Sequence, residues 1–310
     1  MSKNLMTMVM VATMAMTTGM VACGGSGGDG AAPAAPEITI ASPLATMIDG
    51  ELMLDAAAVG LPYQVPLFAN GAVAPCSWST PDAALPDSLS LTSEGWIVGT
   101  PLVEGVKHFT VAVVDAAGVA TSLRLCVNVV AGGASAFYLQ CTQAAYVRRS
   151  QPSIVQTGEL CVGGRVEEVG EVCHTFVRFD LPEIPAGVTA RVDRFGIEVK
   201  YVEREGDLFA TPADSTLSWT ADSLTWSTQP GPGGCLTQPF HLELSELQTA
   251  ILALDAAYII PAERVCTFRI ESSGPEVLFH ADTRTHPRVD HLWLRLEYRG
   301  VLPASSGSKP

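Results

Sequence analysis

Hydrophobic and polar residues alternate with a period of two along much of the chain, which is typical of β-strands with one buried face. Residues 109–113 show this alternation, and residues 123–129 repeat it after a turn that runs from Asp115 to Gly118. The pattern returns at 195–201 and at 292–297. Glycine and proline separate the short runs at even spacing. The pattern therefore predicts an all-β chain built from β-sandwiches.

One stretch, residues 242–257, follows a different period. Leu247 and Ile251 recur at helical spacing, and Ser245 followed by Gln248 forms a capping-box pattern. This combination predicts the main helix of the chain.

The N-terminus has the layout of an export signal. Residues 1–22 place a basic residue before an uncharged apolar run, and small residues precede Cys23. The box Met20–Cys23 resembles the bacterial lipoprotein signal, which implies cleavage before Cys23 and attachment of lipid to it. The alternative is an ordinary secretory signal with a chance cysteine. Residues 23–37 are predicted to be a flexible tether, and Gly24 after the cysteine favours the outer membrane within this resemblance.

Residues 38–131 form the first predicted globular unit. In order, this unit contains Trp78-Ser79, Leu85-Pro86, the run Gly95–Pro101 and the run Phe109–Gly118. These motifs resemble the bacterial immunoglobulin-like domain family that is related to cadherin and dystroglycan-type modules. The resemblance covers nearly the whole unit and implies an immunoglobulin-like sandwich used as a spacer or adhesion module. The tryptophan falls on the apolar phase of its strand, so we expect it in the core.

Residues 132–300 form the second predicted unit. Its opening strand at 145–147, the string FVRFDL at 176–181, the turn at 222–231 and the last strand at 293–298 occur in the order of the DNRLRE domain family. The unit resembles that family, which implies a β-sandwich of the jelly-roll, carbohydrate-binding-module type. Members of the family decorate secreted and surface proteins, and some bind polysaccharide.

Two tryptophans and an arginine of the second unit are the candidate carbohydrate-binding residues. An exposed indole can stack on the C–H face of a pyranose ring while polar neighbours bind its hydroxyls. Trp293 and Arg295 lie on the strand face opposite Leu292 and Leu294, so we expect them at a surface, unless the sandwich buries both faces of this strand. Trp226 precedes a Pro-Gly turn, where it either caps the end of the sandwich or offers a ligand platform.

The cysteines are scattered and no pair has C-x-x-C spacing, which favours disulfides formed in an oxidising compartment. The candidate bridges are Cys76 with Cys126, Cys161 with Cys173, and Cys235 with Cys266, which leaves Cys141. Cys126 shares the strand phase of Arg124 rather than that of the core leucines. A bridge at Cys126 would therefore lie on an outer face of its sheet.

Charge limits the partners of the chain. The formal net charge of −14 argues against nucleic acid and anionic lipid surfaces, and it is compatible with calcium or a neutral glycan. No run of acidic ligands stands at the boundary between the units, so we predict no cofactor.

The densest group of metal-ligand side chains is at 280–291, where His280 and Asp282 would share a strand face and could chelate a metal; the alternative is a solvated loop. Residues 301–310 are predicted to be a disordered tail.

These features predict an exported protein that is lipid-anchored to the cell envelope, in the outer membrane or at the cell surface, with two β-sandwich domains on a flexible tether. Its predicted role is non-catalytic, as a surface adhesion or polysaccharide-binding protein. Two alternatives stay open: a structural envelope spacer without a ligand, and a polysaccharide-active enzyme.

Overall fold

The computed structural model describes residues 35–40, 46–82, 85–156, 160–163, 172–201, 206–233, 237–243, 246–254, 258, 260–272, 277–278 and 292–300. Residues 34–310 cluster into one compact unit. The predicted signal peptide (1–22), the lipidation site Cys23 and the tail (301–310) lie outside the described residues.

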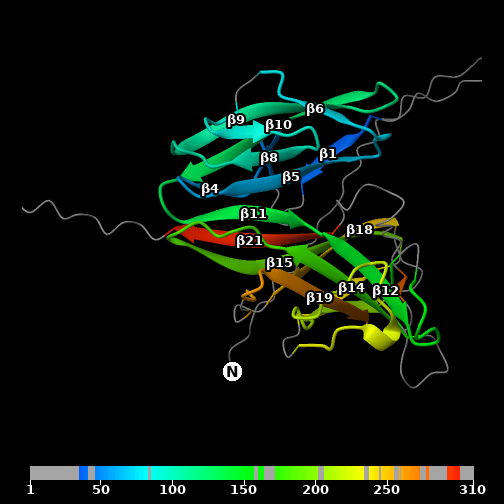
Figure 1. The fold of residues 1–310 in the computed structure, drawn as a ribbon. Coiled ribbons are helices and arrows are strands. Elements are labelled where there is room, and N and C mark those ends of the chain that lie inside the picture. Colours follow the sequence, from blue (N-terminus) through cyan, green and yellow to red (C-terminus); the bar gives the residue numbers. More distant parts are fainter. Residues whose placement is uncertain are drawn as a thin grey trace, which may run out of the picture. The chain divides into compact units, whose positions relative to one another are not determined.

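The described part of the chain is all-β, as predicted, and its strands form three main sheets and one small two-stranded sheet (Figure 1). The first sheet has the order β2-β3-β10-β9-β6, with β4 paired to β10: β2 (Thr46–Ile48), β3 (Glu51–Met53), β4 (Ala57–Ala58), β6 (Ser77–Ser79), β9 (Gly105–Val114) and β10 (Ala120–Val130).

The central sheet has the order β18-β15-β21-β11-β5-β8-β7, with β1 paired to β5: β1 (Glu37–Ile40), β5 (Tyr63–Asn70), β7 (Leu89–Leu91), β8 (Trp96–Gly99), β11 (Ala134–Gln140), β15 (Val188–Tyr201), β18 (Glu246–Ala253) and β21 (Leu292–Gly300).

The third sheet has the order β12-β14-β19-β16-β17: β12 (Gln143–Arg148), β14 (Cys173–Asp180), β16 (Gly206–Pro212), β17 (Phe240–Leu242) and β19 (Val265–Ser272). The small sheet joins β13 (Cys161–Val162) to β20 (Val277–Leu278), and the one helix of the described residues is the single 3-10 turn η1 (Trp226–Thr228).

The turn predicted in the first unit is confirmed. Asp115 accepts hydrogen bonds from the backbone N–H groups of Val73 and Val119, and Gly118 adopts a φ of 78° that closes the hairpin between β9 and β10. A positive φ is readily adopted by glycine, which explains the residue at this position.

The predicted helix at 242–257 is wrong, because residues 246–253 form strand β18. This strand pairs with β15 in antiparallel register, from Glu246 opposite Tyr201 to Ala253 opposite Arg194. Ala250 and Leu252 are buried while Ala253 is exposed, which is a two-residue period. Helical spacing and strand spacing overlap in so short an apolar run, and pairing with β15 decides between them.

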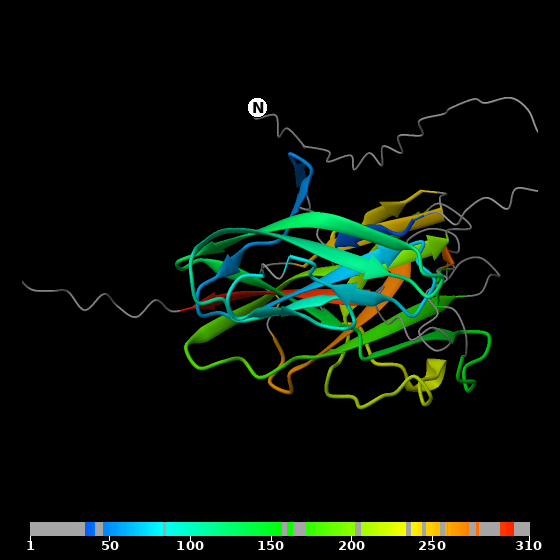
Figure 2. The ribbon, with the colours of Figure 1, turned by 90° about the horizontal axis from the view of Figure 1, so that it is seen from above.

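The central sheet links the two halves of the chain. The boundary predicted at 131–132 falls between β10 and β11, and β11 then joins the central sheet beside β5, where Phe137 pairs with Gln64. One hydrophobic core lies between the first and central sheets, and a second lies between the central and third sheets. Figure 2 looks down on this arrangement from above the first sheet. The two predicted sandwiches thus share a sheet.

Strand β21 contributes to both cores. Leu292, Leu294 and Leu296 are buried in the core toward the third sheet, whereas Trp293 is buried in the core toward the first sheet. Opposite Trp293 in the neighbouring strand stands Gly196. A Cβ atom built at this glycine would lie 2.0 Å from the indole ring, so the tryptophan occupies the space that any other side chain would need.

Replacing Gly196 by alanine should therefore strongly destabilise the protein. We expect a loss of about 3 kcal/mol in the free energy of unfolding, at the upper end of the usual cost of overpacking, because the indole is enclosed and cannot move aside. The control is Gly231→Ala, since a Cβ there meets nothing within 4 Å. Urea denaturation of both variants measures the difference, and equal stabilities would contradict the assigned packing.

Candidate functional site

An open groove lies at one edge of the first core, where an edge strand of the first sheet faces an edge strand of the central sheet. Strand β6 ends the first sheet and β7 ends the central sheet. The groove has a volume of about 470 Å³, within the range of roughly 300–1,000 Å³ that is usual for small-ligand sites. Trp78 of β6 lines it from one side, and the segment Pro86–Leu91 lines it from the other.

The indole of Trp78 is half-buried, because it packs against the first core and also borders the groove. Gly95 lies directly beneath it, and a Cβ at Gly95 would lie 2.7 Å from the indole Nε1. Gly95 itself has a φ of 87° and lies in a turn, in which its backbone N–H donates a hydrogen bond to the carbonyl of Thr92. The turn therefore holds the indole of Trp78 in a fixed position in the ligand-free protein.

The other walls of the groove are rich in oxygen atoms. Ser79, Asp87, Ser88 and Ser90 are exposed and line it together with Trp78. Their hydroxyl and carboxylate groups can donate to and accept from the hydroxyls of a ligand. An immobilised aromatic ring beside several oxygen-bearing side chains is suited to a molecule with one apolar face and many hydroxyls.

Sequence reasoning placed Trp78 in the core, and the structure adds a second role for it. The two edge strands come from different sheets, so their approach depends on the folded arrangement rather than on a local motif. The local signal is weak: Trp78 is flanked by two exposed serines on a strand of only three residues.

The structure places Trp293 and Arg295 in the interior, so the expectation that they form an exposed binding surface is wrong. Trp293 is 2% exposed and packs edge-on against Tyr138, with ring centroids 5.2 Å apart. Arg295 is 8% exposed. The alternation of β21 was read correctly, but the face opposite the leucines is covered by the first sheet and its core.

Arg295 belongs to a buried ionic network. Its guanidinium donates to Asp193 on β15 and lies 3.6 Å from a carboxylate oxygen of Asp55. Asp55 also accepts a hydrogen bond of 2.5 Å from the hydroxyl of Tyr138, and its backbone carbonyl accepts one of 2.8 Å from Tyr63. Burial raises the pKa of Asp193, and Arg295 opposes that shift by favouring the carboxylate. The arginine therefore joins the two halves of the chain instead of contacting solvent.

Trp226 has a different environment from Trp293. Its half-buried indole stacks on His174 of β14, with centroids 4.7 Å apart, and Nδ1 of His174 lies 2.9 Å from Gln229. Burial lowers the pKa of His174, which keeps the stacked imidazole neutral over a wider pH range. Of the two roles considered for Trp226, this packing favours the cap.

The cysteine pairing differs from the expectation in two cases. Cys126 and Cys266 have free thiols, so the bridges Cys76–Cys126 and Cys235–Cys266 are not formed; Cys235 itself lies outside the described residues. Cys76 precedes Ser77, which pairs with Val114, whereas Cys126 pairs with His108 at the other end of β9. Six residues of strand separate those two positions, about 20 Å.

The remaining cysteines lie in the second core. Cys161 and Cys173 are both buried there, on neighbouring strands β13 and β14, and their bridge stays a prediction. Cys141 has a free thiol that donates to the carbonyl of Gln143, and burial raises its pKa to about 12.

The metal-ligand pair predicted at His280 and Asp282 lies outside the described residues. None of the described residues belongs to an apolar helix of membrane-spanning length.

Residues 51–130 match the model of a protein family described as "Putative Ig domain". This match covers the first sheet apart from β2, together with strands β5, β7 and β8 of the central sheet, and it includes Trp78 and Gly95. It agrees with the resemblance seen in the sequence for the first unit. No curated protein matches the chain.

Solved structures resemble the chain only distantly. A putative α-galactosidase from Bacteroides fragilis NCTC 9343 is 20% identical, with a TM-score of 0.23 over 31% of this chain and 18% of that chain. The chain thus spans less than a fifth of that relative. A carbohydrate-binding module of the β-sandwich superfamily is 8% identical, with a TM-score of 0.22 over 87% of this chain and 98% of that chain.

A third structure is SGBP-B of the Bacteroides ovatus mixed-linkage glucan utilization locus, in complex with a mixed-linkage heptasaccharide. It is 12% identical, with a TM-score of 0.18 over 80% of this chain and 51% of that chain.

The buried position of Arg295 can be tested by substitution. Arg295→Ala should lower the free energy of unfolding by about 3–5 kcal/mol, because it leaves the buried carboxylate of Asp55 without its cation and leaves Asp193 with only Arg194, at 3.7 Å. The control is Arg191→Ala, whose partner Glu297 is 3.4 Å away and whose own side chain is 46% exposed; it should cost less than about 1 kcal/mol. Urea denaturation compares the two. Similar losses would show that Arg295 is not the buried link described here.

Proposed function

We propose that this protein is a non-catalytic glycan-binding protein of the cell envelope, which holds a neutral polysaccharide in the Trp78 groove. The observation that carries the proposal is the groove itself: an indole fixed by Gly95, facing Asp87 and several serines across a space of about 470 Å³. The indole would stack on one face of a sugar ring, and the oxygen atoms of the opposite wall would bind its hydroxyls.

The charge of the chain supports a neutral rather than an acidic glycan. The net charge of −14 makes the surface repel polyanions, and Asp87 adds a negative charge at the groove. An open groove between two sheet edges also suits a polymer, because a chain can pass through without having its ends enclosed.

The proposal includes export and a lipid anchor. The sequence Met20–Cys23 and the glycine-rich residues after it support attachment of lipid at Cys23 and a tether that leaves the folded unit free to reach a polymer. A surface position would suit a ligand that is a polysaccharide of the envelope or the surroundings.

The central test is retention of the full chain on a panel of insoluble and immobilised polysaccharides, neutral and acidic, followed by affinity measurement on the best one. We expect binding to a neutral glycan, and Trp78→Ala should weaken it at least about tenfold, as is common for a central aromatic residue. Asp87→Ala is the companion variant, because this residue is exposed and its loss leaves the core intact.

Trp226→Ala is the matched control, since it removes a second half-buried indole outside the groove. Loss of binding in this variant, with normal binding in the Trp78 and Asp87 variants, would move the site to the third sheet. Failure of the folded protein to bind any glycan on the panel would favour the structural spacer instead.

A further inference from the structure

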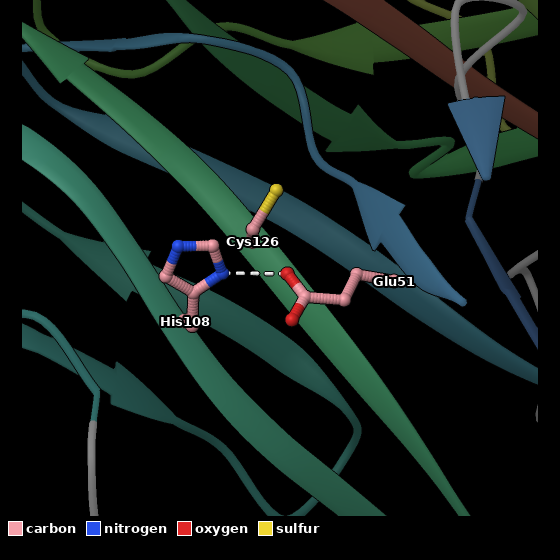
Figure 3. A group of neighbouring side chains, drawn as sticks. All are labelled: Glu51, His108 and Cys126. Atoms are coloured by element: carbon pink, nitrogen blue, oxygen red, sulfur yellow. Dashed lines mark hydrogen bonds and ion pairs between the residues drawn. The ribbon is translucent and has the colours of Figure 1, made fainter. Parts of the chain in front are cut away.

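Three side chains that can ligate a metal meet on the first sheet (Figure 3), and none of them belongs to the first core or lines the groove. They are Glu51 of β3, His108 of β9 and Cys126 of β10, and one ligand atom of each lies within 4.8 Å of the others. Nothing in the proposed glycan-binding role uses this cluster.

The strand register builds the cluster. Cys126 pairs with Met53 on one side and with His108 on the other, so a thioether, a thiol and an imidazole form one row across three adjacent strands. Glu51 stands two residues before Met53, on the same face of β3. Neighbouring positions in such a row have Cβ atoms about 4.5–5.5 Å apart, which brings the ends of these side chains together.

The contacts within the cluster fit a shared ligand. Nδ1 of His108 lies 2.5 Å from Oε2 of Glu51, and the thiol of Cys126 lies 3.3 Å from the thioether sulfur of Met53. Arg124 contacts Oε1 of Glu51 at 2.6 Å, so it holds the carboxylate and leaves Oε2 directed at the histidine. Without a metal, a proton joins the imidazole and the carboxylate.

We propose that Glu51, His108 and Cys126 bind a thiophilic divalent metal ion of the zinc type, which takes the place of that proton. Thiolate sulfur, imidazole nitrogen and carboxylate oxygen are the three ligand types of zinc, at about 2.3, 2.0 and 2.0–2.2 Å. Thiolate and carboxylate would each place one negative charge beside the ion, with Arg124 kept on the far oxygen of the carboxylate.

The site must rearrange slightly to fit the ion. Nδ1 of His108 and Oε2 of Glu51, now 2.5 Å apart, would separate by about 1 Å around a zinc ion, and the sulfur of Cys126, within 4.8 Å of both, would come closer to them. The side chain of His108 is 47% exposed and can rotate, whereas Cys126 is 4% exposed and held in the sheet. The histidine therefore closes onto a thiol that is already in place.

A cysteine nucleophile is the alternative use of the same three residues, and the surroundings of Cys126 argue against it. Burial and the charge of Glu51 raise the pKa of its thiol, whereas reactive cysteines have a lowered pKa. A metal ion that displaces the proton needs no free thiolate beforehand.

The test compares zinc binding by the full chain with that of single variants, after treatment with chelator and reductant. Equilibrium dialysis against Zn²⁺, with metal analysis, should show about one equivalent more in the wild type than in Cys126→Ser or His108→Gln. The affinity for this additional zinc ion should be more than about tenfold lower in either variant than in the wild type, since even changes beyond the direct ligands can cause such a loss. With Co²⁺ as the probe, the thiolate-to-metal charge-transfer absorption should disappear in Cys126→Ser.

The matched control is His241→Gln, because His241 also contacts a carboxylate, that of Asp207 at 2.8 Å, and is similarly exposed. This variant should retain the wild-type amount of zinc. His108→Gln keeps the test valid if the cysteine variant fails to fold, since it alters an exposed side chain. Equal zinc binding by the wild type and His108→Gln, or an equal loss in His241→Gln, would overturn the proposal.

Discussion

The structure depends on one strand that is buried on both faces. Leu292, Leu294 and Leu296 of β21 fill the second core, while Trp293 fills the first. This strand lies between β15 and β11 in the central sheet, and its neighbours must leave room for its largest side chain. Gly196 supplies that room.

This constraint explains why charged residues lie in the same interior. Where the two cores share a sheet, Asp55 comes from the first half of the chain, and Asp193 and Arg295 come from the second. A buried carboxylate is costly unless it is paired, so Asp55 of the first half needs the guanidinium that the second half supplies. The hydroxyl of Tyr138 completes the set on Asp55.

Local periodicity predicted much of the fold, because strands with one exposed face have alternating polar and apolar residues in the sequence. The hairpin of β9 and β10 was predicted together with its turn at Asp115 and Gly118. The face assignment of Cys126 was also right, since it lies opposite the core leucines. Where both faces of a strand are buried, alternation no longer predicts which face is exposed. In β21 it separated Trp293 from the leucines correctly but could not show that a second core covers the tryptophan. The short apolar run of β18 fits both periods, and only its partner β15 makes it a strand.

The candidate sites depend on contacts that no local pattern contains. The groove needs Trp78 from one sheet edge and Asp87 from another, and the metal cluster needs Glu51 and Cys126, which are brought together by a parallel pairing of β3 with β10. Parallel neighbours are far apart in sequence, so their side chains cannot be matched by spacing. Both sites nevertheless follow one physical rule. A half-buried or buried anchor, the indole of Trp78 or the thiol of Cys126, is fixed by the packed sheet, and an exposed side chain beside it, Asp87 in the groove or His108 in the cluster, can adjust to a ligand. The rigid element limits the entropy lost on binding, and the mobile ones supply the polar contacts.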